Sequence, residues 1–306
     1  MSRKTYEAQV NLLVGVLPYV AKETMFALKG GTAINLFYRD LPRLSADIDL
    51  TYLPITDRAN SLAEINAGLT RLAEDISANA PATQANRIAG GGGVETRVMV
   101  RRSNIEVKIE TSPVARGVVN DPELRGVSEA VEDRFGFAEI QVVAFEDLFA
   151  GKLHAALDRQ HPRDLYDVKL LYENEGISDA LFRTFLIYIA SSVRPVHELL
   201  APNLIDLDRS YAREFDGMTS HTVSIEELAQ TRARLIGDIQ SRLDDRAKEF
   251  LLGLHDCTPR FDAIGHASAA ELPAIGWKLL NLEKLKSKNP AKHAKQRDFM
   301  LALFNR

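Results

Sequence analysis

Hydrophobic residues recur at two different spacings along this chain, and the pattern changes near residue 145. Before that point, stretches with apolar residues three and four apart, which indicate helices, are interspersed with short alternating runs, which indicate strands. After it, only the helical spacing continues. We therefore predict a mixed α+β core domain at residues 1–145 and a helical domain at residues 146–306.

The first domain is expected to contain both kinds of element. In chain order these are a helix at 6–21, a strand at 25–28, a strand at 47–52, a helix at 57–76, a flexible surface loop at 78–93, a hairpin at 96–101 and 105–111, a helix-compatible segment at 121–133 and a strand at 138–143. For the second domain the expected helices are 145–159, one starting at Pro162, 178–191, 193–200, 224–242, 244–254 and a last element from Trp277 to the end.

Composition narrows the class of protein. No apolar run reaches the length of a membrane span, and the N-terminal MSRKTYEAQV is too polar for a secretion signal, so we expect a cytoplasmic protein with no membrane partner. The single cysteine, Cys257, excludes an internal disulfide. With 306 residues and a net charge of −4, the chain is not a uniformly basic nucleic-acid binder, and any such surface must be local.

Two aspartates on the strand at 47–52 are the first candidates for chemistry. Side chains two apart on a strand share a face, so Asp47 and Asp49 point together while Ile48 and Leu50 enter the core. Adjacent carboxylates repel, and Mg²⁺ relieves this repulsion by binding one or two of them together with substrate phosphates. The structural alternative is a solvated strand face.

A glycine turn precedes these aspartates, at Lys29-Gly30-Gly31-Thr32. Its backbone N–H groups, unobstructed by side chains at the start of a helix, are suited to phosphate. It is neither a dinucleotide fingerprint nor a Walker A loop, because G-x-G-x-x-G is absent and the lysine precedes the glycines. Alone it could be an ordinary turn, but together with the aspartates it predicts a triphosphate and metal site for nucleotidyl transfer.

A third carboxylate is expected on the strand at 105–111, where Glu106 and Glu110 alternate with apolar residues. Such an acid could bridge metals or accept the proton of an attacking hydroxyl. We select Glu110, although alternation alone permits both, and a solvent-facing edge strand would give the same pattern.

The second domain carries charges on two successive helices. Lys152 and Arg159 lie two turns apart on one face, and Asp164 and Asp167 share a face of the next helix. The cations could neutralise a triphosphate, with the aspartates orienting them. Spacing alone also allows, and by itself favours, a structural network between packed helices.

These motifs together resemble the AbiEii/AbiGii family of nucleotidyltransferase toxins of bacterial toxin–antitoxin and abortive-infection systems, which includes the MenT toxins. The resemblance is carried by Lys29-Gly30-Gly31-Thr32, by Arg43-x-Ser45-x-Asp47-Ile48-Asp49-Leu50, by Val107-Lys108-Ile109-Glu110 with Arg116-Gly117, and by KLHAALDRQHPRDLYD at 152–167. It covers the first half of the chain, and the remainder is similar only in its helical character.

The resemblance implies a polymerase-β-like nucleotidyltransferase core with an appended helical domain that completes the nucleotide pocket. The implied metal ligands are Asp47 and Asp49, with Glu110 as the third acid, and Lys152 and Asp167 are implied catalytic residues. The implied nucleotide-binding residues are Lys29, Gly30, Gly31, Thr32, Arg43, Ser45, Arg159 and Asp164. Thr32 stands where the family commonly has serine, and it keeps the hydroxyl.

The expected function is Mg²⁺-dependent transfer of a nucleotidyl group from an NTP to an acceptor, the 3′ end of tRNA, which blocks translation. Alternatives are transfer to a protein hydroxyl or small molecule, and an NTP-binding module whose main role is to bind a partner. The resemblance also implies an antitoxin partner. From Lys278 onward eight basic residues face two acidic ones, and this segment could hold RNA or be a solvated helix.

Overall fold

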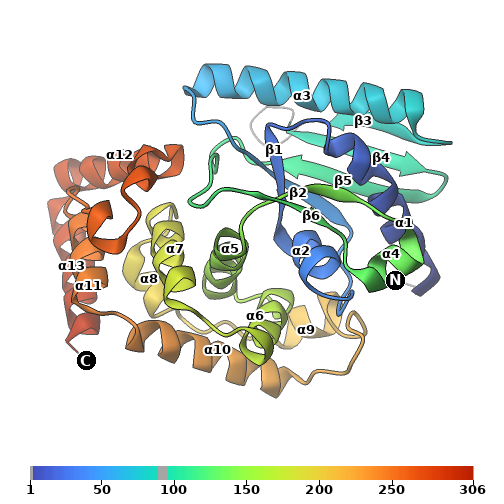
Figure 1. Cartoon of the computed structure of the whole chain (residues 1–306). Helices are drawn as coiled ribbons and strands as arrows, with labels where there is room; N and C mark the ends of the chain where they lie inside the picture. Colours follow the sequence, from blue (N-terminus) through green and yellow to red (C-terminus); the bar gives the residue numbers. More distant parts are fainter. Residues whose placement is uncertain (1–2, 89–95, 306) are drawn as a thin grey trace. The chain divides into compact units, whose positions relative to one another are not determined.

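The structure is a computed structural model that describes residues 3–88 and 96–305, and the chain divides into two compact units. Unit 1 comprises Met1–Ala144 and the short segment Thr219–His221, and unit 2 comprises Phe145–Met218 and Thr222–Arg306. All strands of the described residues belong to unit 1, whereas unit 2 is helical (Figure 1). The functions that the sequence assigns to the two domains stay predictions.

Unit 1 is built on one mixed sheet of seven strands in the order β3-β4-β5-β2-β1-β7-β6. The pairs β2–β5 and β1–β7 are parallel, and the other neighbours are antiparallel. The strands are β1 (Phe26–Lys29), β2 (Asp47–Tyr52), β3 (Gln84–Ile88), β4 (Arg97–Arg102), β5 (Ile105–Thr111), β6 (Glu123–Gly126) and β7 (Glu139–Val142). β2 and β1 therefore occupy the middle of the sheet.

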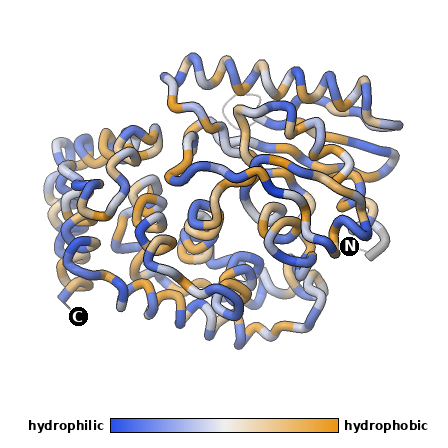
Figure 2. The backbone as a smooth tube through the Cα atoms, viewed as in Figure 1, coloured by the Kyte–Doolittle hydropathy of each residue, from blue (hydrophilic) through white to orange (hydrophobic). Residues whose placement is uncertain are grey.

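Helices cover this sheet and connect its strands. They are α1 (Arg3–Val20), α2 (Gly30–Ala33), the π-helix η1 (Ile34–Tyr38), α3 (Arg58–Asn79) and α4 (Glu129–Phe135). α1 packs against β5, β7 and α3, and α3 packs against β3 and β4. α3 alternates between hydrophilic and hydrophobic turns (Figure 2), as expected for a helix with one face on a core. It begins where Asp57 accepts hydrogen bonds from Ala59 N and Asn60 N.

Two sequence predictions in unit 1 are wrong. The loop expected at 78–93 contains the edge strand β3, and residues 89–93 lie outside the described residues. β3 is polar and gives no strand pattern, but it pairs with β4 throughout, and its Ala85 N donates to Ser77 Oγ of α3 at 2.9 Å. The helical segment expected at 121–133 contains strand β6, which pairs with β7, before α4 begins. In both places tertiary pairing overrides the local pattern.

Unit 2 consists of helices that are mostly amphipathic, such as α10 in Figure 2. They are α5 (Phe145–Asp158), α6 (Pro162–Asn174), α7 (Asp179–Ala190), α8 (Val196–Leu200), α9 (Asp208–Glu214), α10 (Ile225–Ser241), α11 (Asp245–His255), the 3-10 helices η2 (Phe261–Ile264) and η3 (Ala267–Glu271), α12 (Pro273–Lys288) and α13 (Pro290–Phe304). None of the helices in the described parts of the chain is both long and apolar enough to cross a membrane.

Local chain chemistry explains where the unit 2 helices differ from the prediction. α8 starts at Val196 rather than at 193, because Pro195 sits at its N-cap. The last element is two helices, since Pro290 starts α13 and Asn289 caps it by accepting from Lys292 N. The short helices α9, η2 and η3 were not expected, and their few residues carry too little periodicity to be recognised.

Candidate active site

Charged side chains form a row across four neighbouring strands of unit 1. Lys29 on β1 is opposite Asp49 on β2, Asp49 is opposite Glu110 on β5, and Glu110 is opposite Arg97 on β4. Residues directly opposite one another project from the same face of a sheet. The register therefore places two carboxylates between two cations on one face, with Asp47 beside them on the same strand.

The two aspartates of β2 lie in different environments. Asp47 is exposed and Asp49 is half-buried, while Ile48 and Leu50 are fully buried on the other side. Burial raises the pKa of Asp49; the cation of Lys29 opposes this, and the negative charge of Asp47 adds to it. The neighbouring cations therefore do not fully compensate for the cost of burying the ionised Asp49 carboxylate.

Glu110, by contrast, is held by cations. Lys108 Nζ lies 2.8 Å from Glu110 Oε2, and Arg97 Nη2 lies 2.9 Å from Oε1. Burial by itself would raise the pKa of Glu110, but these two partners hold it below its ordinary value. Lys108 also lies 3.8 Å from Asp47 Oδ2. Glu106, the alternative third acid, is opposite Arg101 and paired with it, away from the Asp49 row.

The glycine turn lies directly against this acidic face. Gly30 has φ +77°, and a Cβ at this position would stand 2.6 Å from Asp49 Oδ2. A Cβ on Gly31 would stand 2.5 Å from Arg43 Nη2 and 2.9 Å from Ser45 Oγ. The left-handed backbone and the Asp49 carboxylate therefore favour glycine at position 30, and a side chain at position 31 would displace the Arg43 guanidinium. The Asp49 carboxylate and the Arg43 guanidinium both pack directly against the backbone of the turn.

Hydrogen bonds hold the turn and the segment before β2 in place. Thr32 is fully buried, and its hydroxyl donates to Asp47 O at 2.5 Å and lies 3.2 Å from Ser45 Oγ. The hydroxyl expected to contact nucleotide is thus bonded to the backbone that carries the aspartates. Arg43 is buried, and its Nη1 donates to Leu44 O at 2.9 Å. Contacts of Thr32 and Arg43 with a nucleotide stay predictions.

A divalent cation fits the Asp47–Asp49 pair rather than a three-acid cluster. In the parts of the chain that the structure describes, no group of three histidine, cysteine, aspartate or glutamate side chains is arranged to hold a metal. Glu110 does not supply a third ligand in this conformation, because Lys108 and Arg97 occupy its oxygens. Two adjacent carboxylates beside the glycine turn nevertheless suit Mg²⁺, which takes its remaining ligands from phosphates and water.

In unit 2 the four predicted charged residues form one cluster, and three of them are buried. Lys152 Nζ lies 2.8 Å from Asp164 Oδ1 and 2.9 Å from Asp167 Oδ2, and all three side chains are buried. Arg159 Nε lies 2.5 Å from Asp164 Oδ2, with 64% of its side chain exposed. Burial alone would raise the pKa of Asp164, but Lys152 and Arg159 hold it well below its ordinary value. The cluster therefore has one side chain that reaches solvent.

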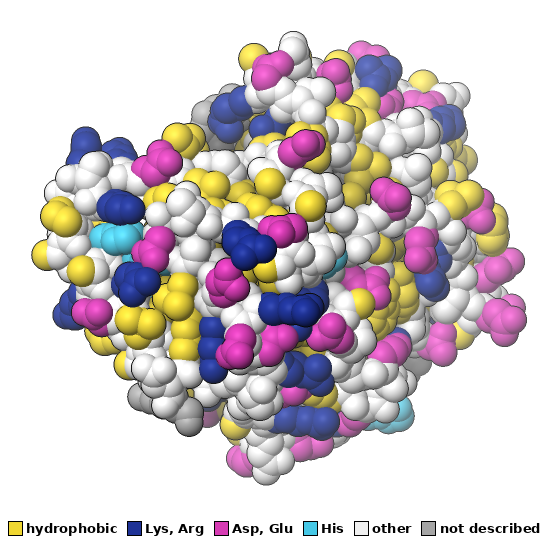
Figure 3. Space-filling model, turned by 60° about the vertical axis from the view of Figure 1, so that its left-hand side comes forward, with side chains coloured by type: hydrophobic (Ala, Val, Ile, Leu, Met, Phe, Trp, Pro, Cys, Tyr) yellow, Lys and Arg dark blue, Asp and Glu magenta, His cyan; other side chains and the backbone are white. Residues whose placement is uncertain are grey.

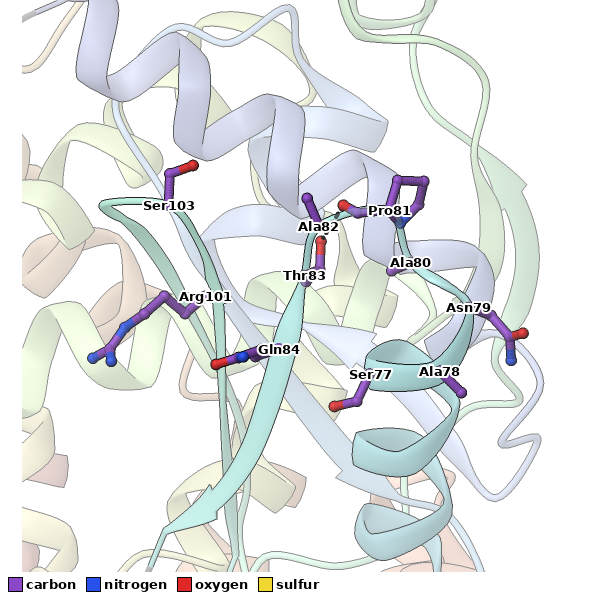
Figure 4. A pocket seen from close by; sticks show the side chains of 10 residues that line it. All are labelled: Ser77, Ala78, Asn79, Ala80, Pro81, Ala82, Thr83, Gln84, Arg101 and Ser103. Atoms are coloured by element: carbon purple, nitrogen blue, oxygen red, sulfur yellow. Dashed lines mark hydrogen bonds between the residues drawn. The ribbon is translucent and has the colours of Figure 1, made fainter.

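A surface pocket of unit 1 is not this site. It has a volume of about 660 Å³ and lies where the end of α3 leads into β3, beside the β4–β5 turn (Figure 4). Its lining residues are Ser77, Ala78, Asn79, Ala80, Pro81, Ala82, Thr83, Gln84, Arg101 and Ser103. None of these was predicted to contact nucleotide or metal.

Several polar residues that support the two clusters were not identified from the sequence. Asn35 is fully buried; its Nδ2 donates to Gly31 O at 2.7 Å, and its Oδ1 accepts from Arg43 N at 3.2 Å. The sequence feature that could have identified Asn35 is a single amide side chain among apolar residues of a helical segment. The hydroxyl of Tyr6 donates to Arg43 O at 3.2 Å, and Gln160 and Arg232 support the α5–α6 turn. Tyr6 and Arg232 are too distant in sequence to be recognised.

A sequence model of one protein family matches residues 11–267, most of the chain. The family is described as the nucleotidyl transferase AbiEii toxin of type IV toxin–antitoxin systems. The chain belongs to this family. It is therefore a nucleotidyltransferase toxin, and the AbiEii family implies an antitoxin partner for it. The resemblance inferred from the motifs is confirmed.

A solved structure supports the fold. MenT4, a nucleotidyltransferase toxin from Mycobacterium tuberculosis, aligns with a TM-score of 0.59 over 90% of this chain and 93% of its own. The sequences are 17% identical, so the likeness establishes the fold alone. The predicted fold class, a mixed sheet flanked by helices with further C-terminal helices, is confirmed. No curated protein matches the chain.

Proposed function

We propose that this AbiEii toxin transfers a nucleotidyl group from an NTP to an acceptor hydroxyl, with Mg²⁺ as cofactor and the 3′ end of tRNA as acceptor, and so blocks translation. The observation that carries the proposal is the direct contact between the glycine turn and the Asp47–Asp49 pair of β2. A triphosphate needs backbone donors and a cation within a few ångströms of one another. Unit 1 has the backbone N–H groups of the turn and, beside them, two carboxylates that would hold the cation.

The charged residues and glycines around the β1–β2 pair have separate roles in this proposal. Asp47 and Asp49 would hold the cation, which when bound supplies electrostatic stabilisation of the phosphates and of the leaving pyrophosphate. The N–H groups at Gly30 and Gly31 bind phosphate oxygens, and the buried Arg43 stabilises charge beside Gly31. Lys29 helps to balance the Asp49 carboxylate across the β1–β2 register.

Glu110 stays in the proposed site, but its role differs from the predicted metal ligand. As long as Lys108 and Arg97 bind both of its oxygens, it orients these cations on the site face rather than holding metal. Release of either partner when substrate arrives would free a carboxylate opposite Asp49 for the acceptor proton. Glu110→Gln distinguishes a positioning acid from a proton acceptor.

The charged cluster of unit 2 is proposed to bind nucleotide. Arg159 presents an exposed guanidinium to solvent, and Asp164 fixes it by two hydrogen bonds of 2.5 and 3.0 Å. A fixed, planar donor suits phosphate oxygens. Lys152 and Asp167 keep the catalytic roles that the family resemblance implies.

The acceptor RNA is proposed to contact α12, which lies beyond the last residue of the family match. Trp277 is 53% exposed, and Lys284 and Lys288 follow it by 7 and 11 residues, which places all three on one stripe of the helix. An aromatic ring for base stacking and cations for phosphates are the elements of single-strand binding. Basic and acidic side chains are interspersed on the face in Figure 3, so such a surface must be local.

One labelling experiment separates the possible activities. Purified protein is incubated with Mg²⁺, each labelled NTP in turn and total tRNA. Label on RNA is the expected result, label on protein or a small molecule would indicate another acceptor, and retained NTP without transfer would indicate a binding module. Omission of the divalent cation should abolish labelling.

The α12 contact has its own test, because Trp277 is the only tryptophan of the chain. Single-stranded RNA should quench its fluorescence, and added salt should weaken the binding. Lys284→Glu should weaken binding and flatten the salt dependence, whereas Arg209→Glu, an exposed change on α9, should reduce both less. Equal effects of the two variants would remove the α12 stripe from the proposal.

A further inference from the structure

The turn between α5 and α6 joins the two halves of the charged cluster in unit 2. Lys152 lies on α5, Asp164 and Asp167 lie on α6, and the helices are separated by Arg159, Gln160 and His161. The conformation of these three residues determines how Lys152 meets the aspartates. It also determines whether Arg159, the first residue of the turn, reaches Asp164.

Gln160 has a left-handed backbone conformation, and both polar atoms of its side chain form hydrogen bonds. Its φ of +50° lies in the left-handed region, which costs a residue with a Cβ about 1 kcal/mol or more. The side chain is 3% exposed; Nε2 donates to Asn203 O at 2.8 Å, and Oε1 accepts from Ile205 N at 3.1 Å and from Arg232 at 2.9 Å. These bonds hold the turn in a conformation that it would not favour by itself.

Arg232 of α10 is buried without a carboxylate. It is 9% exposed, and Nη1 donates to Gln160 Oε1 and, at 2.6 Å, to Ile205 O. No aspartate or glutamate of the described residues forms an ion pair with it, and burial lowers its pKa. A buried cation that contacts only neutral acceptors is costly. A methionine would fill much of the same space at a lower cost, so stability alone explains this arginine poorly.

We infer that Arg232 and Gln160 are positioning residues for nucleotidyl transfer, which fix the α5–α6 turn so that Arg159 is held by Asp164 in the orientation that binds phosphate. This inference rests on the proposed role of the unit 2 cluster. Neither residue touches the substrate, since both are buried under the turn. Their effect passes through Arg159, and catalysis is sensitive to displacements of about 1 Å in such groups.

The test uses Arg232→Met in the full chain, with Arg234→Met as the matched control. Arg234 lies on the same helix but is exposed and stacks on Tyr172, so its loss leaves the turn unchanged. We expect Arg232→Met to lower kcat/KM for transfer about tenfold or more. Arg232→Lys should recover part of this loss, because its ammonium group can still donate hydrogen bonds. Arg234→Met should stay within about twofold of the parent.

A double-substitution cycle with Arg159→Ala separates positioning from a general loss of structure. If Arg232 acts through Arg159, Arg232→Met should cost less than about twofold in a chain that already lacks the Arg159 guanidinium. Equal losses in both backgrounds would overturn the inference, as would parental activity of Arg232→Met. If Arg232→Met does not fold, Gln160→Asn, which tolerates the left-handed backbone but cannot make all three bonds, takes its place in the same cycle.

Amide hydrogen exchange of residues 159–167 gives a readout that does not depend on activity. Exchange in this segment should be faster in Arg232→Met than in the parent or in Arg234→Met. If the parent chain transfers no nucleotide, the proposed function fails, yet the exchange difference still tests the turn. Unchanged exchange would show that Arg232 does not hold the turn and would overturn the inference.

Discussion

The two charged clusters of this protein use the same residue types in opposite ways. On β2 of unit 1, Asp47 and Asp49 lie side by side, and Asp49 is half-buried with incomplete compensation from Lys29. In unit 2, Asp164 and Asp167 are fully buried and share one lysine. The first arrangement leaves charge available for an external cation, whereas the second neutralises its charge internally. Adjacent carboxylates alone therefore do not indicate a metal site; what distinguishes the unit 1 pair is that its neighbouring cations neutralise the carboxylates only in part.

The largest expected effect tests the unit 1 side of this comparison. Asp49→Asn should reduce nucleotidyl transfer by about a thousandfold or more, because one of the two proposed cation ligands is lost. The free energy of unfolding should stay within about 1 kcal/mol of the parent, since the change removes repulsion from Asp47. Transfer assays and urea unfolding measure the two quantities.

Asp75→Asn is the control for this substitution, because Asp75 lies on α3 and pairs with Lys22 at the surface. It should leave transfer unchanged. If Asp49→Asn instead unfolded the protein and kept residual activity in proportion to the folded fraction, the aspartate would be structural and the contrast between the clusters would disappear.

The second largest effect tests the unit 2 side. Lys152→Met removes the cation that two buried aspartates share, and breaking such a pair costs about 3–5 kcal/mol because uncompensated charge remains buried. Urea unfolding should therefore show a strongly destabilised chain. Adding Asp167→Asn should restore part of the loss, since a carboxylate that has lost Lys152 becomes neutral, whereas Asp164 keeps its bonds to Arg159. If Lys152→Met had parental stability, the cluster would be more hydrated than its burial indicates.

A second buried lysine, Lys278, forms hydrogen bonds with neutral acceptors. Lys278 of α12 donates to Ser192 O at 2.7 Å and to Arg194 O, both neutral, and burial lowers its pKa to about 8. Between this value and the ordinary pKa near 10.5 the unfolded chain binds more protons than the folded one, so the free energy of unfolding rises with pH. Between pH 8 and 10 we expect the free energy of unfolding to rise by about 2 kcal/mol more in the parent than in Lys278→Met, as measured by urea unfolding. The same slope in both proteins would contradict this.

The contrast also marks what the sequence could predict. Asp47, Asp49 and the glycine turn were recognisable because they lie within one strand–turn–helix–strand unit, where local geometry alone places them together. The pairing of Glu110 with Lys108 and Arg97 was not recognisable from the sequence. Arg97 belongs to the other strand of the hairpin, and only the register of β4 and β5 places it opposite Glu110. Arg232 meets Gln160 across 72 residues, and no local pattern announces such a contact.

The smallest expected effect decides between the two candidate third acids. Glu106 is 45% exposed and pairs with Arg101 at the surface, so Glu106→Gln should change stability by less than about 0.5 kcal/mol and transfer by less than about twofold. Glu110→Gln removes the partner of Lys108 and Arg97 opposite Asp49, so transfer should fall by more than about tenfold. A loss confined to kcat would indicate that Glu110 accepts a proton, and a loss confined to KM that it only orients its cations. A greater loss for Glu106→Gln than for Glu110→Gln would contradict the register argument, because Glu106 lies four residues before the position opposite Asp49.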